Sequence, residues 1–406
     1  MQDNEKKPAL RFKGFTDPWE QRKLEEYLEV SGQKNFEGIY TKEDVLSVSG
    51  DFGIVNQIEF QGRSFAGASV ANYGVVETGD IVYTKSPLKS NPYGIIKANK
   101  GKNGIVSTLY AVYKPKQSAN PEFVQNYFEQ DARMNNYMHP LVNKGAKNDM
   151  KVSAENALKG QIVFPDIKEQ RTISEFFRNL DTLITLHQRK YEKLVNIKKS
   201  MLDKMFPKNG ASVPEIRFKS FTDPWEQRKL GDITVELSEY ATQELGLPLL
   251  TSSRSGLMYQ DEYRDSRTTK STETLFSVVP VGTCTYRHMS DDDVFHMNIN
   301  TLEKGLVSRE YPVFEASKGN NLEFLVQHIN SSEEFKAFCA EQKKGGTRTR
   351  LYYNTLCQFT VRVPALKEQA QISQCLKKLD TLITLHQRKL EKLQNIKKSC
   401  LEKMFV

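Results

Sequence analysis

The residue types that could support catalysis do not form a recognisable active site. Asn91-Pro92-Tyr93 resembles a loop of amino-methyltransferases, but one proline is missing and no Gly-x-Gly turn accompanies it. Six residues separate Gly94 from Gly101, where a phosphate-binding loop needs four, and Asn103 stands where a magnesium-holding Ser or Thr is required. We therefore expect no catalytic residues in this chain.

A metal site is the second kind of chemistry to consider. His288 and His296 bracket the acidic run from Asp291 to Asp293, and imidazole and carboxylate groups both bind zinc. No helical His pair or cysteine partner supports such a site, so a solvated acidic loop is the favoured interpretation and no metal ligand is predicted. The five cysteines lie in no paired spacing, which favours reduced thiols over a disulfide framework.

Basic and amide side chains in turns are the remaining candidates, because they can reach base edges and phosphates of DNA. For each cluster an ordinary solvated surface is the alternative interpretation. The run 343–350 is the strongest, with four cations and no acid in eight residues. The candidate DNA-binding residues are Lys85, Lys100, Lys102, Asn103, Lys144, Lys147, Arg254, Arg264, Arg267, Arg287, Lys343, Lys344, Arg348 and Arg350.

The elements that must position these loops are marked by an internal repeat. Residues 181–190 return letter for letter as 380–389, an offset of 199 residues, and the copy continues to Phe206 and Phe405. Lys-Glu-Gln at 168–170 and 367–369 keeps the same offset. Such a repeat has to be placed before any fold is assigned.

The repeated stretches are predicted to be two long helices. Neither Pro nor Gly falls within 168–206 or 367–406, and apolar residues recur at the 3-4 spacing of a coiled coil. About 39 residues at roughly 1.5 Å each give a rod near 58 Å. The predicted coiled-coil seam consists of Ile173, Leu180, Leu183, His187, Leu194, Ile197, Ile372, Leu379, Leu382, His386, Leu393 and Ile396.

Two histidines interrupt the apolar seam. Polar seam residues lower stability but define register and partner. One hypothesis is that the rods pack antiparallel, so that His187 crosses His386 near the centre. The alternative is that both are simply solvated or satisfied core positions.

A second repeated pair opens each globular block. Residues 15–24, which contain Trp19, return as 221–230 with Trp225; a capped helix and a short strand both fit this segment. The blocks themselves read mainly as short strands, with faint echoes such as Gly104 to Ser107 against Gly305 to Ser308. The predicted order is a first block at 1–166, a helix at 167–206, linker and second block at 207–365, and a helix at 366–406.

The net charge and the hydropathy of the sequence limit the binding partners and the cellular location that we expect for this protein. The net charge is +8, of which the two predicted rods contribute +4 and +5, leaving the rest near −1. Any DNA contact by the blocks must therefore be made through local patches. We expect no signal peptide and no membrane span, hence a cytoplasmic location.

With the repeats in place, the chain resembles the DNA-specificity subunit of type I restriction-modification enzymes. The resemblance covers essentially all residues; it depends on the duplicated rods after Lys168-Glu169-Gln170 and Lys367-Glu368-Gln369, and on the segments of Trp19 and Trp225. It implies an α+β fold in which two mixed α/β target-recognition domains are joined by two long antiparallel coiled-coil helices with pseudo-twofold symmetry.

The resemblance also implies a function. Each block would read one half of a bipartite site on double-stranded DNA, and the chain would serve in phage defence without being an enzyme itself. Two methyltransferase subunits and motor-nuclease subunits would be its partners, and S-adenosylmethionine, ATP and magnesium would belong to them. A coiled-coil scaffold and a stand-alone DNA methyltransferase or nuclease remain as alternatives.

Overall fold

The computed structural model describes residues 7–85, 91–144, 150–208, 210–263, 274–343 and 347–406. The chain divides into two compact units, one made of residues 1–188 with 388–406 and the other of residues 189–387. Both boundaries fall inside a long helix, so each unit contains a globular block, the first half of the helix that follows it, and the last half of the other helix. No helix in the described part is long and apolar enough to cross a membrane.

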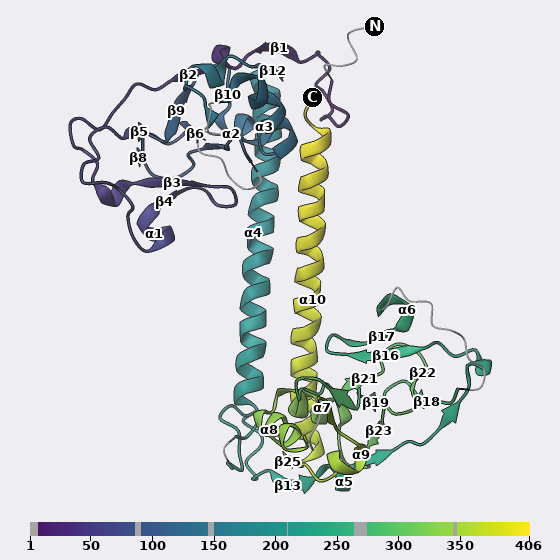
Figure 1. Cartoon of the computed structure of the whole chain (residues 1–406). Coiled ribbons are helices and arrows are strands. Elements are labelled where there is room, and N and C mark those ends of the chain that lie inside the picture. Colours follow the sequence, from purple (N-terminus) through teal and green to yellow (C-terminus); the bar gives the residue numbers. More distant parts are fainter. Residues whose placement is uncertain (1–6, 86–90, 145–149, 209, 264–273, 344–346) are drawn as a thin grey trace. The chain divides into compact units, whose positions relative to one another are not determined.

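The first unit contains a four-stranded antiparallel sheet in the order β2-β9-β6-β7 and three two-stranded pairs around it, with a further pair from its last hairpin (Figure 1). Its elements are β1 (Glu20–Lys23), β2 (Leu28–Val30), β3 (Leu46–Ser49), β4 (Gly53–Asn56), α1 (Gln57–Gln61), β5 (Gly74–Val76), β6 (Ile81–Thr84), β7 (Ile96–Ala98), β8 (Gly104–Val106), β9 (Tyr110–Pro115), α2 (Pro121–Tyr127), α3 (Asp131–Met138), β10 (Asn143–Lys144), β11 (Met150–Lys151), β12 (Gln161–Phe164) and the start of α4 (Ile167–Lys204).

The second unit contains a four-stranded antiparallel sheet in the order β14-β23-β19-β21. Its elements are β13 (Glu226–Lys229), α5 (Leu230–Ile233), β14 (Thr234–Glu236), β15 (Tyr240–Ala241), β16 (Leu250–Ser253), β17 (Gly256–Tyr259), α6 (Gln260–Tyr263), β18 (Phe276–Val279), β19 (Cys284–Thr285), β20 (Met289–Ser290), β21 (Asn298–Ile299), β22 (Gly305–Ser308), β23 (Val313–Ala316), α7 (Leu322–Ser331), α8 (Glu333–Glu341), β24 (Thr349–Arg350), α9 (Tyr353–Leu356), β25 (Thr360–Val363) and the start of α10 (Leu366–Lys403).

The two blocks have similar topologies despite their different sequences, although the pair β5-β8 of the first block corresponds to a three-stranded sheet β15-β18-β22 in the second. In both, the second and third strands of the four-stranded sheet run antiparallel, and a separate hairpin (β3–β4 or β16–β17) is followed directly by a short helix. The faint sequence echoes fall on equivalent strands, β8 and β22. The predicted mixed α/β fold with long helices is therefore confirmed, and the Trp-bearing segments, for which two structures were open, lead into strands β1 and β13.

Close packing explains the glycine that opens the echoed motif. A Cβ on Gly104 would lie 2.4 Å from the backbone oxygen of Asp44, and one on Gly305 would lie 2.6 Å from the side chain of Leu250. Any other residue would push the neighbouring hairpin away from the sheet. The two blocks have thus kept the one residue that lets this hairpin approach.

The long helices begin and end at defined contacts. The Asp166 carboxylate accepts hydrogen bonds from the backbone N–H of Lys168 and Glu169 at 2.7 and 3.1 Å, which satisfies the first turn of α4. At the far ends, the last carbonyl of α10 accepts from Leu10 N at 2.8 Å, and that of α4 accepts from Ile216 N at 2.9 Å. Both helices are 38 residues long.

Within each unit the two helix halves run antiparallel. In the first unit, Phe177 of α4 stacks on Phe405, with ring centroids 5.9 Å apart, and four residues further on Asp181 forms an ion pair with Lys397 at 2.8 Å. As α4 advances, α10 therefore recedes. In the second unit, Lys198 of α4 forms an ion pair with Asp380, while residues nearer the end of α4 and the start of α10 share one apolar core.

One row of the predicted seam is shifted by one residue. Ile173, Leu180 and Ile372 are buried, as predicted for the first row. The second row is wrong at Leu183, Leu382 and Ile396, which are 45%, 42% and 37% exposed.

The less exposed positions next to them are Phe177, Ile184 and Tyr191 in α4 and Leu376, Ile383 and Leu390 in α10. The repeated helical segment contains two apolar rows of residues side by side. Which of the two rows is buried depends on how the helices pack. Leu194, Leu393 and Ile197 are half-buried. His187 and His386 belong to different units, and their crossing stays a prediction.

Aromatic clusters fasten the helix ends to the blocks. Phe405 packs in the first core against Trp19, Phe123 and Tyr127. Phe206 packs in the second core against Trp225 and Phe324. The Met and Phe of the repeated Lys-Met-Phe endings are therefore core residues, and each block is completed by a helix that starts elsewhere in the chain.

Candidate nucleic-acid interface

A buried ion pair holds each block on the helix that follows it. Arg11 donates two hydrogen bonds to the Glu169 carboxylate at 2.8 and 2.7 Å, and Arg217 donates two to Glu368, both at 2.7 Å. Each carboxylate is almost completely buried. The hydrogen bond to Glu169 raises the pKa of Arg11 above its usual value, and Glu368 does the same for the pKa of Arg217. These forks set the direction in which each block leaves its helix.

The third residue of the Lys-Glu-Gln motif locks a neighbouring helix. Gln170 accepts from the backbone N–H of Asn120 at 2.9 Å, and Gln369 accepts from that of Asn321 at 2.8 Å. Asn120 and Asn321 in turn cap α2 and α7 by accepting from Phe123 and Phe324. The repeated motif therefore attaches each block to its helix, and we call this set of contacts the mount. The loops that differ between the two blocks extend from the attached blocks.

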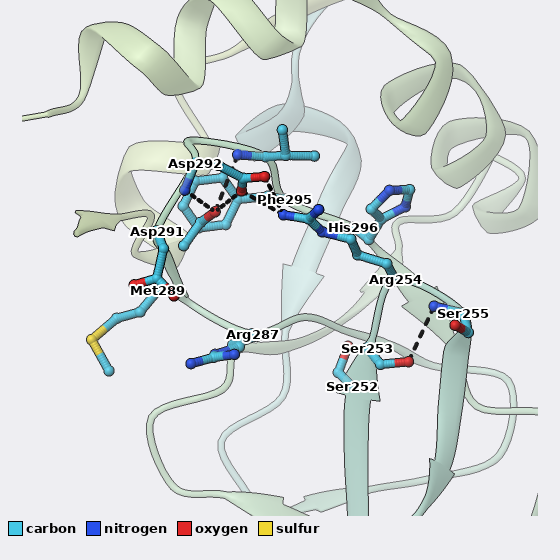
Figure 2. A pocket seen from close by; sticks show the side chains of 12 residues that line it. Ser252, Ser253, Arg254, Ser255, Arg287, Met289, Asp291, Asp292, Phe295 and His296 are labelled. Atoms are coloured by element: carbon cyan, nitrogen blue, oxygen red, sulfur yellow. Dashed lines mark hydrogen bonds and ion pairs between the residues drawn. The ribbon is translucent and has the colours of Figure 1, made fainter. Parts of the chain in front are cut away.

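In the second block, two of the predicted cations, Arg254 and Arg287, line one pocket of about 410 Å³ (Figure 2). The tip of the β16–β17 hairpin forms one side, and β20 with the following loop forms another. Strand β24 pairs with β20, so that Met289 faces Arg350 and Ser290 faces Thr349. This pairing brings the run 347–350 to the acidic loop.

Each carboxylate of the acidic loop contacts a predicted DNA-binding cation or its neighbour. Arg254 donates to both oxygens of Asp292 at 2.5 Å (Figure 2), and Arg348 donates to Asp291 at 2.7 Å. Lys343 lies 3.5 Å from Asp293, which also accepts from the hydroxyl of Thr349. The expected solvated loop is exposed, but its charges are paired, and the pairing with Arg254 lowers the pKa of Asp292.

Two further predicted cations stand beside these pairs. Arg287 lines the same pocket and Arg350 follows Thr349 in β24, and both are exposed. Within the described part of the chain, neither forms an ion pair. The structure thus brings together Arg254, Arg287, Lys343, Arg348 and Arg350 from segments up to 96 positions apart in the sequence.

The two histidines that bracket the acidic loop face different surroundings. His288 is buried, stacks on Tyr352 with ring centroids 5.7 Å apart, and has Nε2 2.9 Å from a carboxylate oxygen of Glu310. His296 lines the pocket. Burial lowers the pKa of both imidazoles, and the nearby Arg254 lowers that of His296 further. Among the described residues no group of three His, Cys, Asp or Glu side chains could hold a metal ion.

In the first block the predicted residues are more dispersed. Lys100 and Lys102 are exposed on the turn between β7 and β8, while Lys85 is half-buried after β6. Asn103 has a structural role there, because its side-chain oxygen accepts from the backbone N–H of Thr78 at 2.8 Å. Lys97, within the same predicted basic segment, is buried and paired with Glu129 at 2.9 Å.

Several predicted residues cannot be placed. Lys147, Arg264, Arg267 and Lys344 lie outside the described residues, and of Lys144 only its position in strand β10 is described.

Sequence reasoning missed an exposed aromatic group in the first block. The hairpin β3–β4 presents Phe52 at its tip, 67% exposed, and its ring lies 5.2 Å from that of Phe60 on α1. Phe65 follows, with the Arg63 guanidinium 4.6 Å from its ring centroid. Arg254 occupies the tip of the equivalent hairpin in the second block. The only signal in the sequence is the aromatic residue in a Gly-Asp-Phe-Gly turn.

The chain is similar in sequence and in fold to known proteins. Residues 296–395 match the family model of the type I restriction modification DNA specificity domain. The resemblance seen in the sequence is confirmed. The matched stretch begins at His296, just after the acidic loop, and runs through α7, α8 and the run 347–350 into most of α10. It includes Glu368 and Gln369, which hold the second block on its helix, and the cations Arg348 and Arg350.

Solved structures of specificity subunits are also similar. The type I restriction-modification S subunit from M. genitalium has 11% sequence identity, with 98% of this chain and 99% of that chain covered and a TM-score of 0.59. The HsdS subunit from Thermoanaerobacter tengcongensis has 14% identity, with 95% and 96% covered and a TM-score of 0.44. The M. genitalium S subunit and this chain share a fold.

Proposed function

We propose that this chain is the sequence-specific DNA-recognition subunit of a type I restriction-modification complex. Each globular block, 1–166 and 207–365, reads one half of a bipartite target, and the helices 167–206 and 366–406 set the gap between the halves. The chain itself does no chemistry. S-adenosylmethionine, ATP and magnesium are held by partner subunits.

One observation supports this proposal above the others. Two blocks of similar topology are attached to the helices that follow them by equivalent contacts. These are the Arg11–Glu169 ion pair with the Gln170 hydrogen bond in the first block, and the Arg217–Glu368 ion pair with the Gln369 hydrogen bond in the second. Their exposed loops differ, with Phe52 at one hairpin tip and Arg254 at the other. Identical mounts with unlike loops are what a reader of an asymmetric sequence needs, because half-sites differ while the gap between them is constant.

The pocket of the second block has the composition of a DNA-contacting surface. Arginines can bind guanine with two hydrogen bonds, and lysines and arginines neutralise phosphates. Arg254 at the tip of the β16–β17 hairpin, Arg287 before β20, and Arg348 and Arg350 at β24 supply these groups. This surface would contact one half-site, and the loops around Lys100 and Phe52 would contact the other.

The repeated helix surface suits two copies of one partner. Leu186 and Leu385 remain 44% and 45% exposed in otherwise identical surroundings, beside cations such as Arg189 and Arg388. Two equal surfaces bind two equal subunits. We assign them to the two methyltransferase subunits, with the motor-nuclease subunits joining the resulting complex.

Exchange of one block tests the reading of half-sites. Residues 25–165 are replaced by the equivalent insert of a relative with a known target, and methylated positions are mapped in a genome that carries the variant with its partners. One half of the target should change while the other half and the gap stay the same. A change in both halves would contradict independent modules.

Gel shifts separate the reader from a scaffold. The chain is incubated with its methyltransferase subunit and a pool of genomic fragments, and the retained fragments are sequenced. Enrichment of one bipartite sequence supports the proposal. Equal retention of all fragments would favour a coiled coil that only assembles its partners.

A further inference from the structure

The acidic loop of the second block occupies cations that the proposed function assigns to DNA. Three consecutive carboxylates, Asp291 to Asp293, contact Arg348, Arg254 and Lys343 respectively. In the pairs Arg254–Asp292 and Arg348–Asp291, all four side chains are at least half exposed. An anionic strand of DNA would meet these same guanidinium groups on the same open face.

Exposed ion pairs of this kind are weak enough to exchange. Pairs between exposed side chains contribute little to folding stability because water and salt screen them. Asp292 is held in place by other contacts: the Ser290 hydroxyl donates to it at 2.9 Å and also accepts from the backbone N–H of Val294 at 3.1 Å. The Asp292 carboxylate is therefore positioned by the loop, whereas the arginines are long, flexible side chains that can turn to another anion.

The loop is also shaped to present its third carboxylate. Asp293 is the one non-glycine residue with a positive φ in the described part of the chain, at 64°. This left-handed conformation turns the backbone so that the side chain of Asp293 reaches Thr349 on β24 and approaches Lys343. The acidic loop and the cation-rich run are thereby fixed against each other by the β20–β24 pairing.

We propose that Asp291 and Asp292 weaken non-specific DNA binding by competing with DNA phosphates for Arg348 and Arg254. On DNA that offers only phosphates, the carboxylates remain a strong competitor and binding is weakened. On the target, additional base contacts outweigh this competition. The inference rests on the proposed function, because it presumes that the second block contacts DNA.

Salt dependence gives this competition a measurable signature. When a protein cation replaces a counterion on a phosphate, the counterion is released, and the observed affinity falls with salt in proportion to the number of such contacts. If a carboxylate loses its arginine on binding, it takes up a cation from solution and offsets part of that release. Removing the carboxylate should therefore make binding to random DNA both tighter and more dependent on salt.

The experiment uses the double variant D291N/D292N of the full chain, assayed with its methyltransferase subunit. Asparagine keeps an oxygen that can accept from Ser290, so the loop is retained. The control E239Q/E333Q makes the same change in net charge at exposed carboxylates that pair with Lys304 and Lys336 and do not line the pocket. Dissociation constants are measured by fluorescence anisotropy for a 30-base-pair duplex of scrambled sequence and for the mapped target, at several salt concentrations.

Relative to the control, D291N/D292N should bind the scrambled duplex more tightly, by up to about fivefold for each carboxylate removed. It should also show a steeper salt slope. Equal affinities and slopes for the variant and the control would overturn the inference while leaving DNA recognition intact. Absence of any DNA binding by the wild-type complex would overturn the proposed function instead.

Discussion

At the residue scale, the exposed arginines of the second block are of two kinds: some form an ion pair with a carboxylate and others do not. Arg254 and Arg348 are paired with Asp292 and Asp291, whereas Arg287 and Arg350 have no ion pair in the described part of the chain. An unpaired, exposed arginine can approach a base or phosphate without first giving up a partner. Arg287 and Arg350 are therefore the residues expected to contribute most directly to DNA affinity.

Replacement of Arg287 or Arg350 with alanine should weaken target binding by about 1–3 kcal/mol if the guanidinium reads a base, and relax the preference at one position. If it contacts only a phosphate, affinity should fall equally for all sequences and the salt slope should decrease by about one. Anisotropy titrations of the complex with target and scrambled duplexes distinguish the two. Arg228→Ala, on β13 beside Glu226, is the control and should bind like the wild type.

A buried imidazole makes the second block sensitive to acid. His328 lies on α7 between Phe206, whose ring centroid is 4.6 Å away, and Trp225. Burial lowers its pKa from 6.5 to about 4, because no charged group compensates for the lost hydration. His328 lies seven residues after Asn321, which caps α7. The equivalent position in the first block is Tyr127, seven residues after Asn120, which caps α2.

The depressed pKa predicts the direction of the pH dependence. Between about pH 6.5 and pH 4 the unfolded chain binds a proton that the folded chain does not, so stability falls as the pH is lowered through this window, by up to about 3 kcal/mol. His328→Phe should flatten the curve over this range. Denaturant titrations at a series of pH values, with Tyr127→Phe as the control, measure it. Identical slopes for His328→Phe and the wild type would contradict the assignment.

At the element scale, each long helix serves two blocks. The first turns of α4 support the first block through Glu169 and Gln170, and its end supplies Phe206 to the second core. For α10 the order is reversed, since Glu368 and Gln369 mount the second block and Phe405 completes the first. Segments at opposite ends of the sequence are therefore parts of the same cooperative unit.

Replacement of Phe405 with alanine should destabilise the first block by about 3–5 kcal/mol, because a large buried ring is removed from a packed core. Hydrogen exchange should show lost protection in β6, β9 and α2, although the substitution lies nearly 300 residues away in the sequence. Phe206→Ala should produce the reverse pattern, with lost protection in the second block. Equal effects of either substitution on both blocks would contradict the division into two units.

At the scale of the whole molecule, the helices are the part of the chain that can set the gap between half-sites. Their seam repeats every seven residues, so whole heptads can be added without changing which residues face the partner helix. Residues 182–188 and 381–387 are identical heptads that end at the boundaries between the two units. These are the positions at which the length of the helices can be altered without touching either block.

Duplication of residues 182–188 and 381–387 together should lengthen each helix by about 10 Å, which corresponds to roughly three base pairs of duplex. Mapping of methylated sites should then show both half-sites unchanged and the gap longer by about three. Duplication in one helix alone breaks the pairing of the helices and should abolish or weaken methylation. An unchanged gap in the double duplication would contradict the helices as the ruler.

The framework of this protein, two blocks and two long helices, is predictable from its amino-acid sequence. The repeat at an offset of 199 residues and the absence of Pro and Gly from both stretches were sufficient for two long helices between two blocks, because helix formation depends on local pattern. The mounts were visible as the repeated Lys-Glu-Gln and Trp segments, although their contacts were not. The choice between two adjacent apolar rows was wrong at Leu183, since spacing alone does not say which row is covered.

The pairing of charged side chains in the second block depends on the folded arrangement of its strands and loops. Arg254, Asp291 and Arg348 are separated by up to 94 positions in the sequence and are brought together by the register of β20 against β24 and by the β16–β17 hairpin. Loops such as these have no periodicity that predicts their path. Electrostatic partners depend on distances of a few ångströms, and those distances are set by strand pairing across the block and not by neighbours along the chain.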